Sequence, residues 1–329
     1  SILALLSLDI SNFNTKEVTD ISRMFRFCQK VRNLNVNSFV TDKVVNMSKL
    51  FQSCKVAYGI DVSKFKTDLV TDMSYMFEEC SLQKLDFSGF NTSNVKNMRN
   101  MFKYTTSLKS LNLSNFITKN VEDMSQMFMY ANALNILDIS KFDTSKVTNM
   151  SSMFEHIWSV NSLDVSNFDT SNVEDMSYMF KECSSLKSLD VSNFITDKVF
   201  DMYEMFYKCT SLTSLDLSSF VTSKIKDMNS MFYSDSNIPS LDLKHFDTSL
   251  VTDMADMFNG CSSLTSLDVS SFNTPNLLNC SHMFESVSKI QSIDLKKFNT
   301  SNVKDMNSMF KYMYSLTSLD VSNFDTGSV

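Results

Sequence analysis

The chain has 329 residues, a formal net charge of -7 at pH 7, and a composition of 43% hydrophobic and 20% charged residues. This apolar fraction suffices for a continuous core and excludes an intrinsically disordered chain, and the acidic balance without a basic stripe argues against a nucleic-acid-binding surface. No apolar run approaches the roughly 20 residues of a membrane span, and Ser1 begins in mid-pattern. We therefore expect a mature piece or a fragment of a globular protein.

One 26-residue unit recurs about twelve and a half times along the chain. A unit of this size cannot bury its apolar face alone, so stacked units are expected to form a repeat solenoid. We predict a single solenoid domain over 1–329, a fragment without evident caps. The steps are 26 residues except one of 25, after Phe77. The Leu-Asp-x-Ser motif that marks the unit has its Asp at Asp9, Asp61, Asp86, Asp138, Asp164, Asp190, Asp216, Asp242, Asp268, Asp294 and Asp320, with Asn35 and Asn112 in the two gaps.

The first element of the unit is a short strand. Leu215, Asp216 and Leu217 alternate with period two, which is typical of a strand, and stacking would join such strands into a parallel sheet along one side of the solenoid. Its column of Asp side chains would carry charges about 5 Å apart, which repel by about 3 kcal/mol per neighbouring pair. Hydrogen bonds from the adjoining Ser column, for example Ser166 and Ser192, are expected to relieve this repulsion. Bound cations and direct ligand contact are the alternatives.

The second element is a predicted short helix. Ile225, Met228, Met231 and Phe232 follow the spacing i, i+3, i+6 and i+7, which indicates a two-turn α-helix or 3-10 segment. Thirteen Thr residues, from Thr15 to Thr326, precede this stripe at one fixed position, where their hydroxyls are expected to cap exposed N–H groups. An ice- or mineral-like template is the alternative for this Thr column. We expect the Asp/Asn column before the first Met, from Asp20 to Asp305, to form hydrogen bonds with the backbone as well.

Six of the seven cysteines occupy one position of the unit, and Cys280 replaces a core Met. The nearest Cys spacing is 19 residues, whereas zinc sites need pairs two to four apart. We expect buried free thiols, with disulfides between stacked neighbours such as Cys28 and Cys54 as the alternative. Since the three histidines occupy three different positions of the unit and only four glycines are scattered along the chain, we expect no catalytic site, no cofactor and no metal. The six cysteines in the column are Cys28, Cys54, Cys80, Cys183, Cys209 and Cys261, and Thr105, Ala131 and Asp235 replace Cys there.

Recognition is expected where the units differ. The two positions after each Met-Phe pair vary most, and in three successive units the second of them is aromatic. Trp158, the sole tryptophan, follows two residues later. Aromatic anchors are typical of binding hot spots, so a partner-binding edge is predicted there, with ordinary drift at a solvent-facing turn as the alternative. The candidate residues are Tyr104, Tyr130, His156, Trp158, Tyr207 and Tyr233.

The unit resembles a known repeat family. The run Cys-Ser-Ser-Leu-Lys-Ser-Leu-Asp-Val-Ser-Asn-Phe at 183–194 is followed by Thr196, Val199, Met202, Met205 and Phe206. This pattern is similar to the leucine-rich-repeat surface proteins of the BspA-like class, the bacterial surface proteins with a 26-residue repeat, and the resemblance covers the whole chain. It implies leucine-rich-repeat winding, an extracellular or cell-surface location and a protein partner, and it implies no chemistry.

The expected function is non-enzymatic adhesion or recognition outside the cell, with a host protein or another protein bound through the solenoid surface. The alternative is a structural protein that self-assembles end to end into a filament or surface layer, because the apparently uncapped ends would offer a template for stacking. In that case the partner would be a second copy of the chain.

Overall fold

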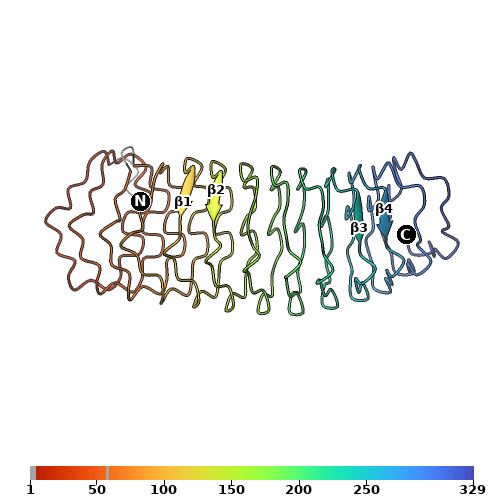
Figure 1. The fold of residues 1–329 in the computed structure, drawn as a ribbon, viewed down its shortest axis with the longest axis horizontal. Helices are drawn as coiled ribbons and strands as arrows, with labels where there is room; N and C mark the ends of the chain where they lie inside the picture. The colour runs from red at the N-terminus through yellow and green to blue at the C-terminus, as the bar shows by residue number, and fades with distance from the viewer. Residues whose placement is uncertain (1–4, 57–58) are drawn as a thin grey trace. The chain divides into compact units, whose positions relative to one another are not determined.

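The computed structural model describes residues 5–56 and 59–329, and its chain divides into two compact units between Phe168 and Asp169. Figure 1 labels the four strands of these units. In the first unit, strands β1 (Ser110–Asn112) and β2 (Ile136–Asp138) form a parallel pair. In the second unit, β3 (Ser240–Asp242) and β4 (Ser266–Asp268) do the same. The prediction of one domain over 1–329 stays a prediction.

The strand registers show that one sequence repeat makes one coil. Leu111 pairs with Leu137 and Leu241 with Leu267, and each of these central leucines is buried between two exposed neighbours. The predicted solenoid and its period-two alternation are thus confirmed at these coils. The predicted sheet is much shorter than expected, because the described residues contain only these four strands. The total of about twelve and a half coils stays a count from the sequence.

The predicted helical side is wrong, since the described residues form no helix. The segment from Met73 to Cys80 is a series of tight turns in which the Met76 N–H donates to the Met73 carbonyl and the Cys80 N–H to the Phe77 carbonyl, both at 3.2 Å. Tyr75 has a φ of 58° and Glu79 a φ of 55°. A left-handed residue in the third place of a four-residue turn is the type II arrangement, and it interrupts any right-handed helix.

Hydrogen bonding between coils explains why turns replace the helix. The Tyr75 N–H donates to the carbonyl of Arg99 in the next coil at 2.8 Å, and the Phe77 N–H donates to Met101 at 3.0 Å. An α-helix would use these donors internally. The turns still place apolar side chains inward at the spacing that suggested a helix, because Met76 and Phe77 are both fully buried.

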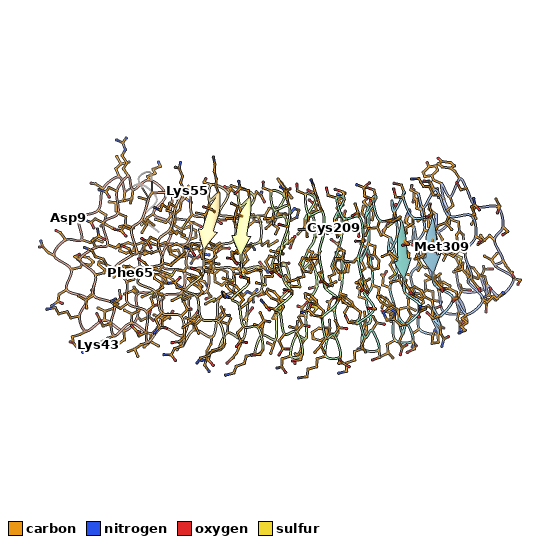
Figure 2. All side chains as sticks on the ribbon, in the orientation of Figure 1. Asp9, Lys43, Lys55, Phe65, Cys209 and Met309 are labelled. Carbon is orange, nitrogen blue, oxygen red and sulfur yellow. The ribbon has the colours of Figure 1, made fainter. Side chains whose placement is uncertain are left out.

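Stacked columns of identical side chains form the core. In the first unit the rings of Phe102 and Phe128 are stacked with centroids 5.8 Å apart, and in the second unit Phe206 and Phe232 are stacked at 5.9 Å. Figure 2 shows the side chains along both units, and Phe65, Cys209 and Met309, which it labels, are buried members of such columns. The stacked repeat units thus place like apolar side chains against one another in successive coils.

The threonine column satisfies the backbone of the neighbouring coil. The buried Thr222 hydroxyl donates to the Asp247 carbonyl at 2.9 Å and accepts the Asp247 N–H at 2.8 Å. Its expected role at a helix start is therefore wrong, although its role in backbone satisfaction is confirmed. The Asp/Asn column behaves as predicted, because the side chain accepts the N–H two residues on at all twelve positions from Asp20 to Asp305.

Candidate functional site

The four predicted aromatic residues of the first unit form one continuous group, called here the aromatic row. Tyr104 stacks on Tyr130 with ring centroids 4.7 Å apart, and Tyr130 stacks on His156 at 4.0 Å. Trp158 meets His156 edge to face at 5.9 Å. The structure therefore brings together side chains from three successive coils, as the repeat positions predict.

The local backbone explains why these rings align. Tyr104, Tyr130 and His156 have φ values of 57°, 58° and 58°, so all three side chains leave the chain from the same left-handed turn position. The Tyr104 N–H donates to the Met129 carbonyl at 2.9 Å, and this kind of bond between coils sets the spacing of the rings. A left-handed non-glycine residue costs of order 1 kcal/mol, which the stacking contacts help to offset.

The two ends of the aromatic row are exposed, whereas Tyr130 is half-buried and His156 is buried. Tyr104 is 37% exposed and Trp158 44%, whereas His156 is 8% exposed. The Trp158 Nε1–H donates to His156 Nδ1 at 3.3 Å, and His156 Nε2 lies 3.4 Å from Oε1 of the buried Glu155. His156 thus holds the indole in place, and Tyr104 and Trp158 are the rings that a partner would touch first.

Charged side chains lie beside the aromatic row. The Lys103 ammonium lies 5.3 Å from the centroid of the Tyr104 ring, within the range of a cation–π contact. Burial raises the pKa of Tyr104, and the nearby carboxylates, Glu155 first among them, act in the same direction. The Tyr104 hydroxyl is therefore a neutral hydrogen-bonding group at physiological pH.

The other two candidates, Tyr207 and Tyr233, form a pair in the second unit. Their rings are stacked with centroids 4.7 Å apart, and the ammonium groups of Lys181 and Lys208 lie 4.9 and 5.0 Å from the Tyr207 centroid. They occupy the repeat position one residue before that of the aromatic row. We therefore treat this pair as a separate feature.

Hydrogen bonds from serine residues relieve the repulsion between the carboxylates of the Asp column, as predicted. Asp190 Oδ1 accepts the Ser192 N–H at 3.0 Å and the Ser192 hydroxyl at 2.6 Å. Both bonds lower the pKa of Asp190, and the bond from the hydroxyl has the larger effect. The same pairing recurs at Asp138 with Ser140. In the part of the chain that the structure describes, no group of three or more His, Cys, Asp and Glu side chains is placed to hold a metal ion.

The cysteine column contains buried free thiols, which confirms the prediction and excludes the alternative of disulfides between stacked neighbours. Burial raises the pKa of Cys80 to about 12, and its Sγ donates to the Phe51 carbonyl at 2.9 Å. Asp235 is the outlier of the column because it is 0% exposed. Its Oδ1 accepts the Cys209 N–H at 2.9 Å, its Oδ2 has no hydrogen-bond partner among the described residues, and desolvation raises its pKa well above the ordinary value.

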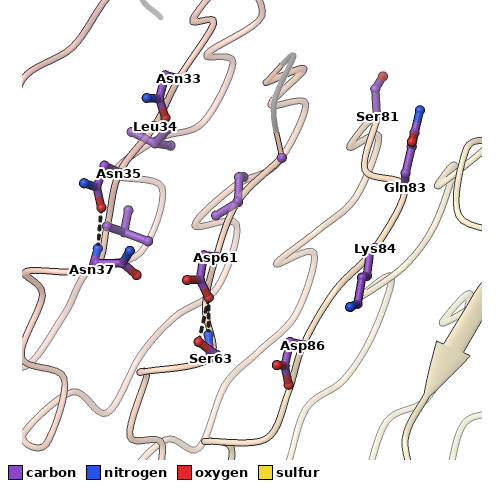
Figure 3. Close-up of a pocket in the computed structure, with 13 residues that line it drawn as sticks. Asn33, Leu34, Asn35, Asn37, Asp61, Ser63, Ser81, Gln83, Lys84 and Asp86 are labelled. Atoms are coloured by element: carbon purple, nitrogen blue, oxygen red, sulfur yellow. Dashed lines mark hydrogen bonds between the residues drawn. The ribbon is translucent and has the colours of Figure 1, made fainter.

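A polar hollow of about 790 Å³, which the sequence did not predict, lies in the first unit on the side formed by the Leu-Asp-x-Ser motifs (Figure 3). It is lined by residues of three successive coils within 33–37, 59–63 and 81–86. Two adjacent departures from the repeat signal it, namely Gly59 and the 25-residue step after Phe77. No helix within the described residues has the length and apolarity needed to cross a membrane.

Comparisons with known proteins place the chain in a family. A search of curated proteins gave no match. Among solved structures, the chain is similar to an LRR protein of Leptospira interrogans, with 14% identity and a TM-score of 0.30 over 90% of this chain and 79% of the other. It is also similar to an internalin (inlF) of Listeria monocytogenes, with 14% identity and a TM-score of 0.24 over 86% of this chain and 82% of the other. The family described as "Mycoplasma protein of unknown function, DUF285" matches residues 3–84, 55–156, 131–240 and 235–329. Because these segments together extend from residue 3 to residue 329, the chain belongs to the DUF285 family.

Proposed function

We propose that this chain is a non-enzymatic recognition protein that binds a protein partner through the aromatic row. The observation that carries the proposal is the continuous stack from Tyr104 to His156, with Trp158 against it. Tyrosine and tryptophan are enriched in binding hot spots because they bury large areas at little cost in rotamer freedom. The stack holds these rings in place before a partner arrives, which lowers the ordering cost of association.

The shape of the row favours a protein over a small ligand. Its rings follow an edge of turns across three coils, with the exposed Tyr104 at one end and the exposed Trp158 at the other. Face-to-face stacking covers the inner ring faces, so a partner would meet ring edges, the hydroxyls and the indole. Such a strip suits the centre of a protein interface, where anchors are surrounded by weaker contacts.

The location belongs to the same proposal. The unit at 183–206 resembles the BspA-like leucine-rich-repeat surface proteins, and we extend from this resemblance an extracellular or cell-surface location and one solenoid domain over 1–329. The partner would then be an adhesion target outside the cell. Nothing in the described residues favours the end-to-end filament considered as the alternative, and we do not propose it.

A triple substitution tests the proposal. Tyr104→Ser, Tyr130→Ser and Trp158→Ser together remove the two exposed rings and the half-buried Tyr130 ring, and leave His156 in place. Purified extracellular-matrix and serum proteins would be presented one at a time to the immobilised chain by biolayer interferometry. We expect the wild-type chain to bind one of them and the triple variant to lose at least 30-fold in affinity, because hot-spot truncations cost about 2 kcal/mol or more.

The matched control uses aromatic residues outside the row. Tyr312 and Tyr314 are 47% and 78% exposed, and Lys311 lies over the Tyr312 ring as Lys103 lies over Tyr104. Tyr312→Ser with Tyr314→Ser should leave binding unchanged. Equal binding by the wild type and by the triple variant, with circular dichroism showing both folded, would remove the site.

A further inference from the structure

The polar hollow in the first unit has the size of a ligand site. Its volume of about 790 Å³ lies within the range of about 300–1,000 Å³ that is usual for small-molecule pockets. Figure 3 shows Asn33 and Asn35 from one coil, Asp61 and Ser63 from the next, and Gln83 and Lys84 from the third around it. The hollow lies on the strand-equivalent side of the coils, so it is distinct from the aromatic row on the turn segments.

The middle coil lacks a side chain at one position that lines the hollow. Asn33, Gly59 and Lys84 stand at the same repeat position, two residues before the Asp/Asn of the motif, in three successive coils. Gly59 has a φ of +85°, and a Cβ added there would meet no heavy atom within 4 Å. In the described residues, no main-chain hydrogen bond joins 33–37 to 59–63. At this position the middle coil therefore presents no side chain to the hollow, whereas its two neighbours present Asn33 and Lys84.

Several polar groups around the hollow are free to bind a ligand. Asn35 Oδ1 accepts the Asn37 N–H at 3.0 Å, and Asp61 Oδ1 accepts both the N–H and the hydroxyl of Ser63 at 3.0 and 2.7 Å. These bonds fix the Asn35 and Asp61 side chains. The carboxamides of Asn33 and Gln83 and the ammonium of Lys84 are exposed, and they form no side-chain hydrogen bond with the described residues.

We propose that this hollow binds a neutral oligosaccharide. A sugar hydroxyl both donates and accepts hydrogen bonds, and the free carboxamides of Asn33 and Gln83 supply donors and acceptors side by side. Asp61 and Asp86 against Lys84 leave only one net negative charge, which disfavours a polyanion and gives little attraction for a polycation. The apolar lining residues are buried, so the hollow offers no apolar floor to a hydrophobic ligand; they are Leu34, Val36 and Ile60.

Filling the hollow is the sharpest test. Gly59→Asn would place a side chain in the empty space, and Asn tolerates a left-handed backbone better than most residues. The matched control is Ser188→Asn, at the same repeat position in the second unit. A second variant, Asn33→Ala with Gln83→Ala, removes two exposed side chains without touching the core.

The probes are neutral tetra- to hexasaccharides of glucose, mannose, galactose and N-acetylglucosamine, titrated into the full chain by calorimetry or NMR. We expect at least one series to bind, a loss of tenfold or more in affinity in Gly59→Asn and in the double variant, and unchanged binding in Ser188→Asn. The triple variant of the aromatic row should also keep saccharide binding, which separates this proposal from the proposed function. Absence of binding by all four series, or binding equal in the wild type and the double variant, would overturn the inference, as would a Gly-Ser peptide that binds with the same dependence on Gly59.

Discussion

Replacing Asp235 by Cys should stabilise the second unit in a pH-dependent way. Asp235 is fully buried in a column whose other members include Cys209 and Cys261, and only one of its carboxyl oxygens has a hydrogen-bond partner among the described residues. Desolvation raises its folded-state pKa well above the ordinary value of 3.8. The folded chain therefore keeps this proton at pH values where the unfolded chain has lost it.

The sign of the effect follows from proton linkage. Below about pH 4 both states are protonated, and the carboxyl adds no pH dependence. Above that, the unfolded state binds fewer protons than the folded state, so the free energy of unfolding of the wild type falls by up to about 1.4 kcal/mol per pH unit until the folded carboxyl ionises. Asp235→Cys lacks this loss. We expect the stability difference between variant and wild type to grow as the pH rises above about 4, and an unsatisfied buried oxygen adds about 1–3 kcal/mol at every pH.

Urea unfolding followed by circular dichroism between pH 4 and pH 8 measures this difference. Cys261→Asp is the matched control, because it introduces the same buried carboxyl one coil further along and should reproduce the pH-dependent loss. If wild type and Asp235→Cys show parallel stability curves across this pH range, the account of a buried protonated carboxyl is refuted.

Three further predictions concern the scaffold. Gly89→Ala should destabilise the first unit by several kcal/mol or prevent its folding, because the new Cβ would lie 2.3 and 2.7 Å from two main-chain oxygens. Lys64→Ala, at the same position of the preceding coil, is the control and should change the thermal midpoint little. Thr222→Val should lower the free energy of unfolding in urea by about 2–4 kcal/mol, because one N–H and one carbonyl of the next coil lose their hydrogen-bond partner. Substitution of the exposed Thr213 by Val should change that free energy by no more than about 0.5 kcal/mol. All seven cysteines should resist iodoacetamide in the folded chain, because they are buried and thiol reactivity needs the thiolate. Rapid labelling, counted by mass spectrometry, would contradict their burial.

The repeat columns could be predicted from the sequence because every coil imposes the same environment. Stacking places Phe102 against Phe128, and it requires a hydrogen-bond donor beside Asp190. The position of a residue in the unit therefore indicated whether its side chain is buried or hydrogen-bonded. The alignment of Tyr104, Tyr130 and His156 follows from the same logic, since equal positions in successive coils must stack. Their role in binding is not a matter of stacking and stays a proposal.

The helix could not be distinguished from turns by periodicity. Met73, Met76 and Phe77 face inward in either case, and the difference lies in the left-handed backbone at Tyr75, where nothing in the side chain demands a positive φ. Bonds between coils, which local sequence does not encode, decide the conformation. The hollow could not be predicted for the opposite reason, because Gly59, which lines it, departs from the repeat, and no column predicts its surroundings.

The accessibility of Trp158 tests the central claim most directly. It is the only tryptophan of the chain, it is 44% exposed, and it belongs to the aromatic row, so its fluorescence reports on the proposed interface without labelling. Acrylamide quenching would be measured on the free chain and on its complex with a matrix or serum protein that it binds, chosen or engineered to lack tryptophan. We predict that the partner reduces quenching of Trp158 several-fold and shifts its emission to shorter wavelength. A saturated complex in which Trp158 is quenched as in the free chain would contradict recognition through the aromatic row.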